Sequence, residues 1–236
     1  MVKDYRPLQK MFMEVPPSYD MLNRLLTFRF DKLWRKRGAR EILKDNPERV
    51  LDLCCGTGDL ALQLKAIAPC TTEILGLDYS EPMLEYARKK ALKRGLPGVV
   101  FHFGDAAAMP YLDNYFDVVG IAFAFRNLSY RNKDLDKFLA EILRVLSPGG
   151  KLVIIETSQP KNQVLRKLFH AYLTYIASPV GGWFSGYHGA YKYLAHSARN
   201  YYNEKELKEI LLKGGFKKVE STAYLGGIAG LLVAVK

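Results

Sequence analysis

Residues 50–61 have the sequence VLDLCCGTGDLA, in which an apolar, strand-like run enters a turn with two glycines and then a helical pattern. Gly56 and Gly58 carry no Cβ, so backbone N–H groups in this turn can approach a ligand closely. Asp78 lies 20 residues beyond Gly58, at the end of the next apolar run. This spacing suits a carboxylate that accepts hydrogen bonds from the two hydroxyls of a ribose. The stretch therefore predicts a nucleoside-containing cofactor at the carboxyl edge of a parallel sheet.

The glycine pattern alone does not identify the cofactor, because Gly-x-Gly-x-x-Ala would equally suit a nicotinamide dinucleotide. Asp52 lies inside the end of the strand, where a dinucleotide site prefers apolar packing. An acidic side chain at this position could instead hold the amino-acid tail of a sulfonium cofactor. Gly104-Asp105-Ala106 follows the third apolar run, where a carboxylate can accept from an adenine amino group. The tight helix-to-strand turn LSPGG at 146–150 completes the set.

This combination resembles the motif set of class I methyltransferases, and the resemblance implies S-adenosylmethionine as cofactor. We assign the cofactor site to Asp52, Gly56, Thr57, Gly58, Asp78, Tyr79, Asp105 and Ala106. Two alternatives stay open at this point. The glycines could serve only a structural turn, and the Thr57 hydroxyl could begin a helix rather than contact the cofactor. Cys54 and Cys55 are interpreted as small packing residues, not nucleophiles.

From Glu48 onward, short β-branched runs alternate with amphipathic helical segments, which predicts a parallel sheet with crossover helices. The strands are expected at Arg49–Cys54, Glu73–Tyr79, Val99–Gly104, Phe116–Phe123, Gly150–Glu156, Lys218–Tyr224 and Ile228–Val235. Only Leu225-Gly226-Gly227 joins the last two, which allows an antiparallel hairpin and no helix. We therefore predict an α/β, Rossmann-like class I methyltransferase fold whose seven-stranded, mostly parallel sheet ends in an antiparallel hairpin. Ser80 and Asn203, the latter with Glu206, are expected to cap helices.

Two segments lie outside this alternation. Tyr19–Leu43 has the pattern of one basic, amphipathic helix, and Ser158–Tyr202 is dense in aromatic residues. We interpret both as a cap over the carboxyl edge of the sheet, where open α/β sheets bind ligands. The expected division is an N-terminal helical cap over residues 1–45 and a Rossmann-like domain over 46–236 that carries the aromatic-rich insertion 158–202.

The composition limits partners and compartment. The 236 residues carry a formal net charge of +11, which favours anionic partners such as nucleic acid, an acidic ligand or an anionic membrane. The three cysteines show no metal-ligand spacing, so we expect a reduced, cytoplasmic protein without a metal. No apolar run approaches the roughly 20 residues of a membrane span. The chain is therefore expected to be soluble or peripheral to a membrane.

More specific motifs recur along the chain. They are Tyr19-Asp20-x-x-Asn23 with Trp34, Gly104-Asp105-Ala106, Phe125-Arg126-Asn127, Glu156-x-Ser158-x-Pro160, Tyr191-Lys192-Tyr193-Leu194-x-x-Ser197 and Gly226-Gly227-Ile228. From Tyr19 to Lys236 the sequence resembles the ubiquinone/menaquinone biosynthesis C-methyltransferases. The resemblance implies methyl transfer to a ring carbon of a prenylated quinol and cofactor contacts at Thr57, Asp78, Asp105 and Ala106. The chain departs from the family pattern at Asp31, Ala122 and Gly189, which bears on the exact quinol.

An aromatic carbon becomes nucleophilic when a quinol hydroxyl loses its proton, so the protein must align the ring and stabilise phenolate charge. Arg126 and Asn127, after the fourth strand, are our first candidates for this role. Tyr19, Asn23 and Tyr191 could complete the polar contacts. The alternatives are a surface salt bridge for Arg126 and plain packing for Tyr191.

The prenyl tail of such a substrate resides in the bilayer, so we expect peripheral contact with the anionic inner face of the cell membrane through the basic helix and the aromatic insertion. No nucleic-acid partner is expected, since the chain has no RNA-recognition motif. A homodimer is also expected, from related enzymes. The alternatives are a methyltransferase for another small-molecule or RNA acceptor, and a cofactor-binding scaffold without catalysis.

Overall fold

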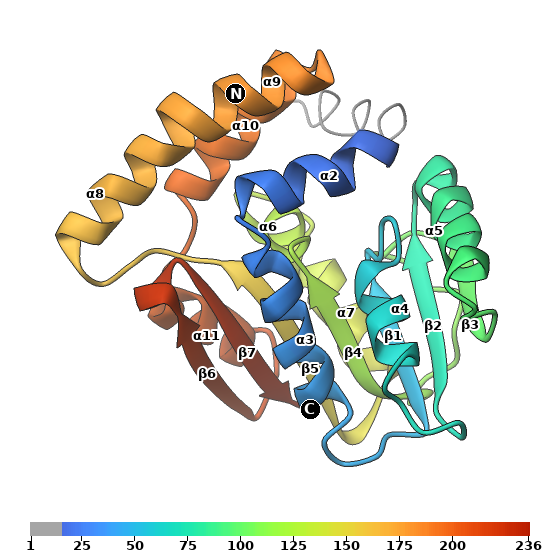
Figure 1. Ribbon diagram of the computed structural model, residues 1–236. Helices are drawn as coiled ribbons and strands as arrows, with labels where there is room; N and C mark the ends of the chain where they lie inside the picture. The colour runs from blue at the N-terminus through green and yellow to red at the C-terminus, as the bar shows by residue number, and fades with distance from the viewer. Residues whose placement is uncertain (1–15) are drawn as a thin grey trace.

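The computed structural model describes residues 16–236 and the side chains from Asp20 onward. Its sheet has seven strands in the order β3-β2-β1-β4-β5-β7-β6 (Figure 1). The strands are β1 (Arg49–Leu53), β2 (Glu73–Asp78), β3 (Val99–Phe103), β4 (Phe116–Ala122), β5 (Leu146–Thr157), β6 (Lys218–Tyr224) and β7 (Ala229–Val235). Strands β1 to β5 pair in parallel, whereas β7 is antiparallel to both β5 and β6. The predicted fold class is confirmed.

Helices cover both faces of the sheet. They are α3 (Phe30–Ile42), α4 (Asp59–Lys65) and α5 (Glu81–Lys93) on one face, and α6 (Phe125–Ser129), α7 (Leu135–Val145) and α11 (Glu204–Lys213) on the other. Side chains that alternate along β1 point to opposite faces. Val50 packs with the first group of helices, and Leu51 and Leu53 pack with the second. These two apolar layers fix the strand ends that carry the site.

The predicted helix caps are present with one difference. Asn203 and Glu206 form a reciprocal capping box at the start of α11, and Gly214 ends that helix. Ser80 precedes α5 as expected, but its side chain makes no capping hydrogen bond. Instead, its backbone N–H donates to the carboxylate of Asp78.

The N-terminal segment differs from the prediction of one helix over Tyr19–Leu43, which is wrong. The chain forms α2 (Pro16–Leu26), then breaks, and continues as α3. At the break, Phe28 and Arg29 have positive φ values of 51° and 64°. Hydrophobic periodicity does not reveal such a break. Phe and Arg rarely adopt the left-handed region, so neither residue type signals it in the sequence. As a result α3 packs on the sheet, with Trp34 and Ile42 buried, while α2 leaves it.

A second group of helices lies above the carboxyl edge of the sheet (Figure 1). It consists of α2, α8 (Gln163–Tyr172), the π-helical turn η1 (Leu173–Ala177), α9 (Ser178–Ser185) and α10 (His188–Arg199). We call this group the cap layer. Leu22 of α2 is buried with Ala190 and Tyr191 of α10, which joins α2 to the other members. Within residues 16–236, none of the helices has both the length and the apolar character needed to cross a bilayer.

Candidate cofactor and acceptor site

The glycine turn after β1 has the shape of a cofactor cradle. Gly56 and Gly58 have φ values of +52° and +73°, in the left-handed region that favours glycine. A Cβ built on Gly56 would meet no atom within 4 Å, so the space at this backbone is open to a ligand. A Cβ on Gly58 would lie 2.8 Å from the ring of Phe101, so close packing excludes a side chain there. At Gly56 the turn therefore fits an extended ligand that lies against bare backbone, as the methionine part of S-adenosylmethionine would.

Asp78, at the end of β2, lies beside this turn, and backbone donors hold both of its carboxylate oxygens. The Gly56 N–H donates to Oδ2 at 2.8 Å, and the Ser80 N–H donates to Oδ1 at 2.9 Å. Burial raises the pKa of Asp78, and these N–H groups oppose that shift. Each carboxylate oxygen has a second lone pair, so Asp78 can still accept from a ribose. The structure thus brings together the two elements that the sequence spacing paired.

Asp52 is fully buried within β1, with 1% of its surface exposed. Its Oδ2 accepts from the Ala61 N–H at 2.9 Å, in the first turn of α4. Burial raises the pKa of Asp52 to about 7, although that N–H and the Arg35 guanidinium act in the opposite direction. A carboxyl group in this state gains from any cation placed beside it, because the cation favours its ionised form. The ammonium group of an amino-acid tail is such a cation.

Tyr79, Asp105 and Ala106 lie at the carboxyl ends of the neighbouring strands β2 and β3. Asp105 is exposed, and its Oδ1 accepts from the Ala107 N–H at 2.9 Å. Ala106 is buried, whereas Tyr79 is 42% exposed. Together with Asp78 they extend the cradle toward the edge of the sheet, where an adenosine would lie.

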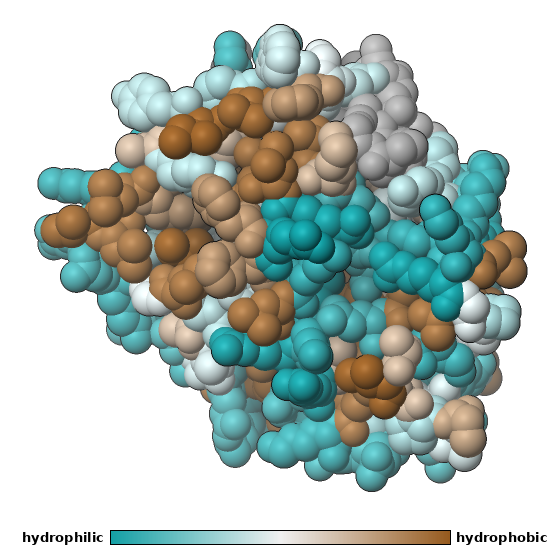
Figure 2. Space-filling model, viewed as in Figure 1, coloured by the Kyte–Doolittle hydropathy of each residue, from teal (hydrophilic) through white to brown (hydrophobic). Residues whose placement is uncertain are grey.

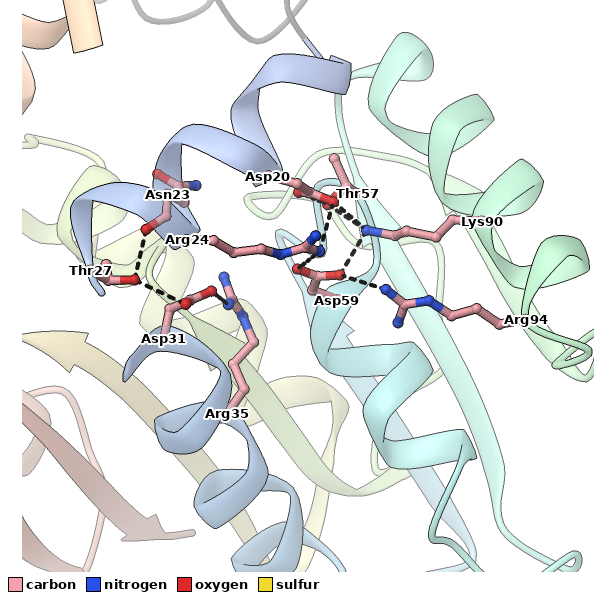
Figure 3. Close-up of polar contacts among 10 residues, drawn as sticks. All are labelled: Asp20, Asn23, Arg24, Thr27, Asp31, Arg35, Thr57, Asp59, Lys90 and Arg94. Atoms are coloured by element: carbon pink, nitrogen blue, oxygen red, sulfur yellow. Dashed lines mark hydrogen bonds and ion pairs between the residues drawn. The ribbon is translucent and has the colours of Figure 1, made fainter. Parts of the chain in front are cut away.

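Thr57 contacts other protein groups, as Figure 3 shows. Its side chain is buried, and its hydroxyl donates to Asp20 Oδ1 of α2 at 2.6 Å. Thr57 Oγ1 itself accepts from Lys90 Nζ of α5 at 3.0 Å. Helix α4 has Gly58 as its N-cap residue, so Thr57 does not cap it. The hydroxyl that we considered as a cofactor contact thus links the glycine turn to the cap layer.

Cys54 and Cys55 border the glycine turn. Burial raises the pKa of both thiols well above their ordinary value. They therefore stay protonated near neutral pH, which agrees with a packing role.

Arg126 is the second residue of α6, the short helix that follows β4, and the end of β5 holds it in place. Its N–H donates to Glu156 Oε2 at 3.0 Å, and its Nη1 donates to Thr157 Oγ1 at 2.7 Å. The same Nη1 lies 3.7 Å from Glu156 Oε1. Glu156 is 1% exposed and the Arg126 side chain 11%, so this pair is not the surface salt bridge of the alternative interpretation. Among the described residues, buried Arg126 Nε has no hydrogen-bond partner.

The other candidate acceptor residues lie in α6 and in the cap layer. Asn127 is half-buried in α6, and Asn23 is half-buried in α2. Tyr191 is 5% exposed, and its ring packs so tightly on α9 that a Cβ at Gly181 would lie 2.1 Å from it. Packing is thus part of its role. The side chain of Tyr19 lies outside the described part of the structure.

Several residues that shape the site were not among the predicted ones. Glu156 is a buried acid that ends an otherwise apolar run in β5, and this contrast is a signal that could have identified it. Asp20 belongs to a quoted motif, but no role was assigned to it. Lys90 is one of three lysines on α5, and its partners on α2 and α4 are far away in the sequence. No local pattern could have shown these contacts.

With this geometry established, comparison with known proteins decides the family. The model of the ubiE/COQ5 methyltransferase family matches residues 1–236, the whole chain. The chain belongs to this family. Demethylmenaquinone methyltransferase of Thermus thermophilus is 44% identical over 206 residues, which cover 87% of this chain and 91% of that protein. The enzyme of the same name from Deinococcus radiodurans is 40% identical over 229 residues, or 97% and 92% of the two chains.

A third relative in the ubiE/COQ5 family, ubiquinone/menaquinone biosynthesis C-methyltransferase UbiE of Geobacter sulfurreducens, is 35% identical over 97% of this chain and 88% of its own. Solved structures agree on the fold. A SAM-dependent methyltransferase from Thermotoga maritima, titled as a possible histamine N-methyltransferase, matches 96% of this chain and 99% of its own with a TM-score of 0.66 at 22% identity. This chain is thus a C-methyltransferase, and S-adenosylmethionine is its cofactor.

Proposed function

We propose that this ubiE/COQ5 family enzyme methylates a ring carbon of a demethylated, prenylated naphthoquinol, the reduced form of a demethylmenaquinone. The family acts in quinone biosynthesis, and the relatives from Thermus and Deinococcus carry the name demethylmenaquinone methyltransferase. The observation that carries the proposal is the Arg126–Glu156–Thr157 group. It lies at the carboxyl ends of β4 and β5, and β4 is the sheet neighbour of β1, which carries the glycine turn.

The cofactor would lie along the carboxyl ends of β1, β2 and β3. The amino-acid ammonium would contact Asp52, the ribose hydroxyls Asp78, and the adenine end Asp105 and Ala106 beside Tyr79. The bare backbone of the Gly56–Gly58 turn would contact the methionine portion. When bound, S-adenosylmethionine supplies an electrophilic methyl group that a carbon nucleophile can attack in line, with the thioether of S-adenosylhomocysteine as the leaving group.

On the acceptor side, the enzyme has to place a deprotonated quinol so that its ring carbon faces that methyl group. An arginine stays protonated near neutrality, so Arg126 is suited to stabilise a phenolate oxygen and not to remove its proton. Arg126 Nε is a buried donor without a partner among residues 16–236, and a quinol oxygen would satisfy it. Asn127, from the same helix, would complete the acceptor contacts together with Tyr19, Asn23 and Tyr191 from the cap layer.

Glu156 acts as a positioning residue for Arg126. Its two oxygens accept from the Arg126 and Thr157 backbone N–H groups, and the Thr157 hydroxyl also lies 2.9 Å from Oε1. Because Glu156 is buried and accepts several hydrogen bonds, it holds the Arg126 guanidinium in one direction before the substrate binds. Glu156→Gln should therefore weaken turnover more than cofactor binding.

The test is a single-subunit assay with the purified enzyme, methyl-labelled S-adenosylmethionine and a chemically reduced demethylmenaquinol. We expect label in the quinol and a product heavier by one methyl group, with no transfer to the oxidised quinone. A demethylated benzoquinol in a parallel reaction tests the second ring type of the family, and transcribed RNA tests the nucleic-acid alternative. Label in the RNA or in neither quinol would refute the proposal.

We further propose that the cap layer contacts an anionic membrane, where the prenyl tail of the quinol resides. Figure 2 shows apolar side chains gathered on this side of the molecule. Those more than half exposed are Leu25, Phe28, Val164, Leu168, Tyr175, Ile176, Trp183 and Phe184, with Met21. Residues 158–202 hold five Lys or Arg side chains and no Asp or Glu. Exposed apolar and aromatic side chains with nearby cations are the features of a surface that lies on anionic lipid.

Vesicle sedimentation tests this contact. The wild-type enzyme should bind vesicles that contain phosphatidylglycerol more tightly than vesicles of phosphatidylcholine alone. Trp183→Ser with Leu168→Ser should weaken that binding. Leu112→Ser is the matched control, because Leu112 is 75% exposed and lies outside the cap layer. Equal binding to both kinds of vesicle would refute the membrane proposal without affecting the methyltransferase assignment.

A further inference from the structure

Six polar side chains from three separate elements meet between the cap layer and the glycine turn (Figure 3). Asp20 and Arg24 come from α2, and Thr57 and Asp59 from the glycine turn and the start of α4. Lys90 comes from α5 (Glu81–Lys93), and Arg94 is the C-cap residue of that helix. We call this group the Lys90 cluster. It joins segments that lie 31 to 70 residues apart in the sequence.

Lys90 is the centre of the cluster. Its Nζ donates to Asp20 Oδ2 and to Asp59 Oδ1, both at 2.7 Å, and to Thr57 Oγ1 at 3.0 Å. An ammonium group has three N–H donors, and each of them is used here. The Lys90 side chain is only 10% exposed, and those of Asp20 and Asp59 are 7% and 15% exposed. Lys90 therefore does not behave as a solvated lysine on a helix surface.

The arginines add charge at the edge of the cluster. Arg24 Nη2 lies 3.5 Å from Asp59 and 3.6 Å from Asp20, and Arg94 Nη2 lies 3.7 Å from Asp59. Burial by itself would raise the pKa of Asp59, but the charges of Lys90, Arg35 and Arg24 lower it to about 2. Asp59 is thus ionised, and removal of Lys90 would leave it and Asp20 with only the longer contacts to Arg24 and Arg94. Breaking one partner out of a buried ion pair is costly for this reason.

Helix α2 has two attachments of different kinds. Leu22 packs in the apolar cluster with Ala190 and Tyr191, and the Tyr172 hydroxyl donates to the Leu26 carbonyl at 2.7 Å. These contacts tie α2 to the other helices of the cap layer. Asp20 and Arg24 tie it to the glycine turn through the Lys90 cluster. The Lys90 cluster is therefore a polar attachment of α2 to the glycine turn, separate from its apolar attachment to the other cap helices.

We propose that Lys90 is a positioning residue which locks α2 against the glycine turn and so retains the cofactor beneath the cap layer. The inference rests on the cofactor site proposed above. In this arrangement Asp20 is the cap-layer side of the lock, and Thr57 and Asp59 are its core side. The lock orders the acceptor-contacting residue Asn23, one turn along α2 from Asp20, relative to the cofactor.

The test measures the dissociation rate of S-adenosylhomocysteine, the demethylated form of the cofactor, from the full-length protein by stopped flow. Lys90→Met should speed dissociation by roughly tenfold or more, because loss of one partner of a buried charge pair acts mainly on the off-rate. Asp20→Asn should act in the same direction, and the double variant should be little worse than either single variant. Lys89→Met is the matched control: the adjacent lysine is exposed, and its replacement should leave the rate unchanged.

A thermal melt of each variant separates a local effect from general instability. If Lys90→Met does not fold, Asp20→Asn decides the question, because it keeps the shape of the side chain. Dissociation at the wild-type rate from folded variants that differ only in melting temperature would overturn the proposal and leave the cluster a structural one. Failure of the wild-type protein to bind S-adenosylhomocysteine at all would instead refute the cofactor site itself.

Discussion

The sheet and the cap layer are stabilised in different ways, although together they enclose one site. In the sheet, side chains such as Leu51, Val119 and Ile154 are completely buried, and helices seal both faces. In the cap layer, none of the ten residues of α8 is buried, and large apolar side chains face outward. The sheet therefore derives its stability from its own core. The cap layer is held by a few apolar contacts and the Lys90 cluster, and its outer face is available for another surface.

The largest contrast should appear in stability. Ile154→Ala removes a fully buried side chain from the centre of the sheet and should lower the free energy of unfolding by about 2–5 kcal/mol. Leu168→Ala, at a position of α8 that is 63% exposed, should change it by no more than about 0.5 kcal/mol. Urea denaturation of both variants measures the difference. Similar losses in the two variants would show that the cap layer is also part of a cooperative core.

Substitutions in the two regions should also affect different kinetic parameters. Arg126→Ala removes the buried guanidinium at the end of β4 and should lower kcat by about 10²–10³-fold, with cofactor affinity close to wild type. Asn23→Ala, in the cap layer, should mainly raise the KM for the quinol. Steady-state kinetics measures kcat and the KM for the quinol, and calorimetry with S-adenosylhomocysteine measures the affinity for the cofactor product. Loss of cofactor affinity equal to the loss of turnover in Arg126→Ala would contradict its assignment to the acceptor.

Cofactor binding at Asp52, in the sheet, should depend on pH. If Asp52 holds the ammonium of the cofactor, ligand binding requires its ionised form, and the pKa of free Asp52 is about 7. Affinity for S-adenosylhomocysteine should therefore rise with pH up to about 7, by at most about tenfold per pH unit. Asp52→Asn should abolish this dependence and weaken binding above pH 7. A pH-independent affinity in the wild type would argue against the contact.

Stability of the free protein should change with pH in the opposite sense. The folded pKa of Asp52 lies above its ordinary value of 3.8, so the folded state binds this proton more tightly than the unfolded state. The contribution of Asp52 to the free energy of unfolding therefore falls as pH rises from about 4 to about 7. Comparison of wild type with Asp52→Asn by urea denaturation at several pH values isolates this contribution.

The smallest effect is expected for a hydroxyl in the cap layer. Tyr191→Phe keeps the ring that packs on α9 and removes only the polar group. One neutral hydrogen bond contributes about 0.5–1.5 kcal/mol, so the KM for the quinol should rise by roughly two- to tenfold. The melting temperature and kcat should change little. An unchanged KM would leave Tyr191 with a packing role alone.

The features that the sequence could predict are those that depend on local patterns. Six of the seven strands begin within one residue of the expected position, since buried strands are local apolar runs between turns. The exception is β5, which begins at Leu146 and pairs with Phe116 across a register shift. The glycine turn, Asp78 and the Asn203 capping box were also predictable, because each depends on a short, local pattern.

The remaining features depend on contacts between distant residues. The break between α2 and α3 requires positive φ at Phe28 and Arg29, which no periodicity reveals. Lys90 and Glu156 act through partners that only the tertiary fold brings to them. The roles of the site residues, the division into a cap over 1–45 and a domain over 46–236, and the homodimer stay predictions.

A crystal structure of the protein soaked with S-adenosylhomocysteine tests the cofactor site most directly. The account predicts ribose hydroxyls on the Asp78 carboxylate, the ammonium group beside Asp52 and the homocysteine chain along the Gly56–Gly58 backbone beneath α2. The ligand bound elsewhere, or a cradle that admits a nicotinamide dinucleotide in its place, would contradict it.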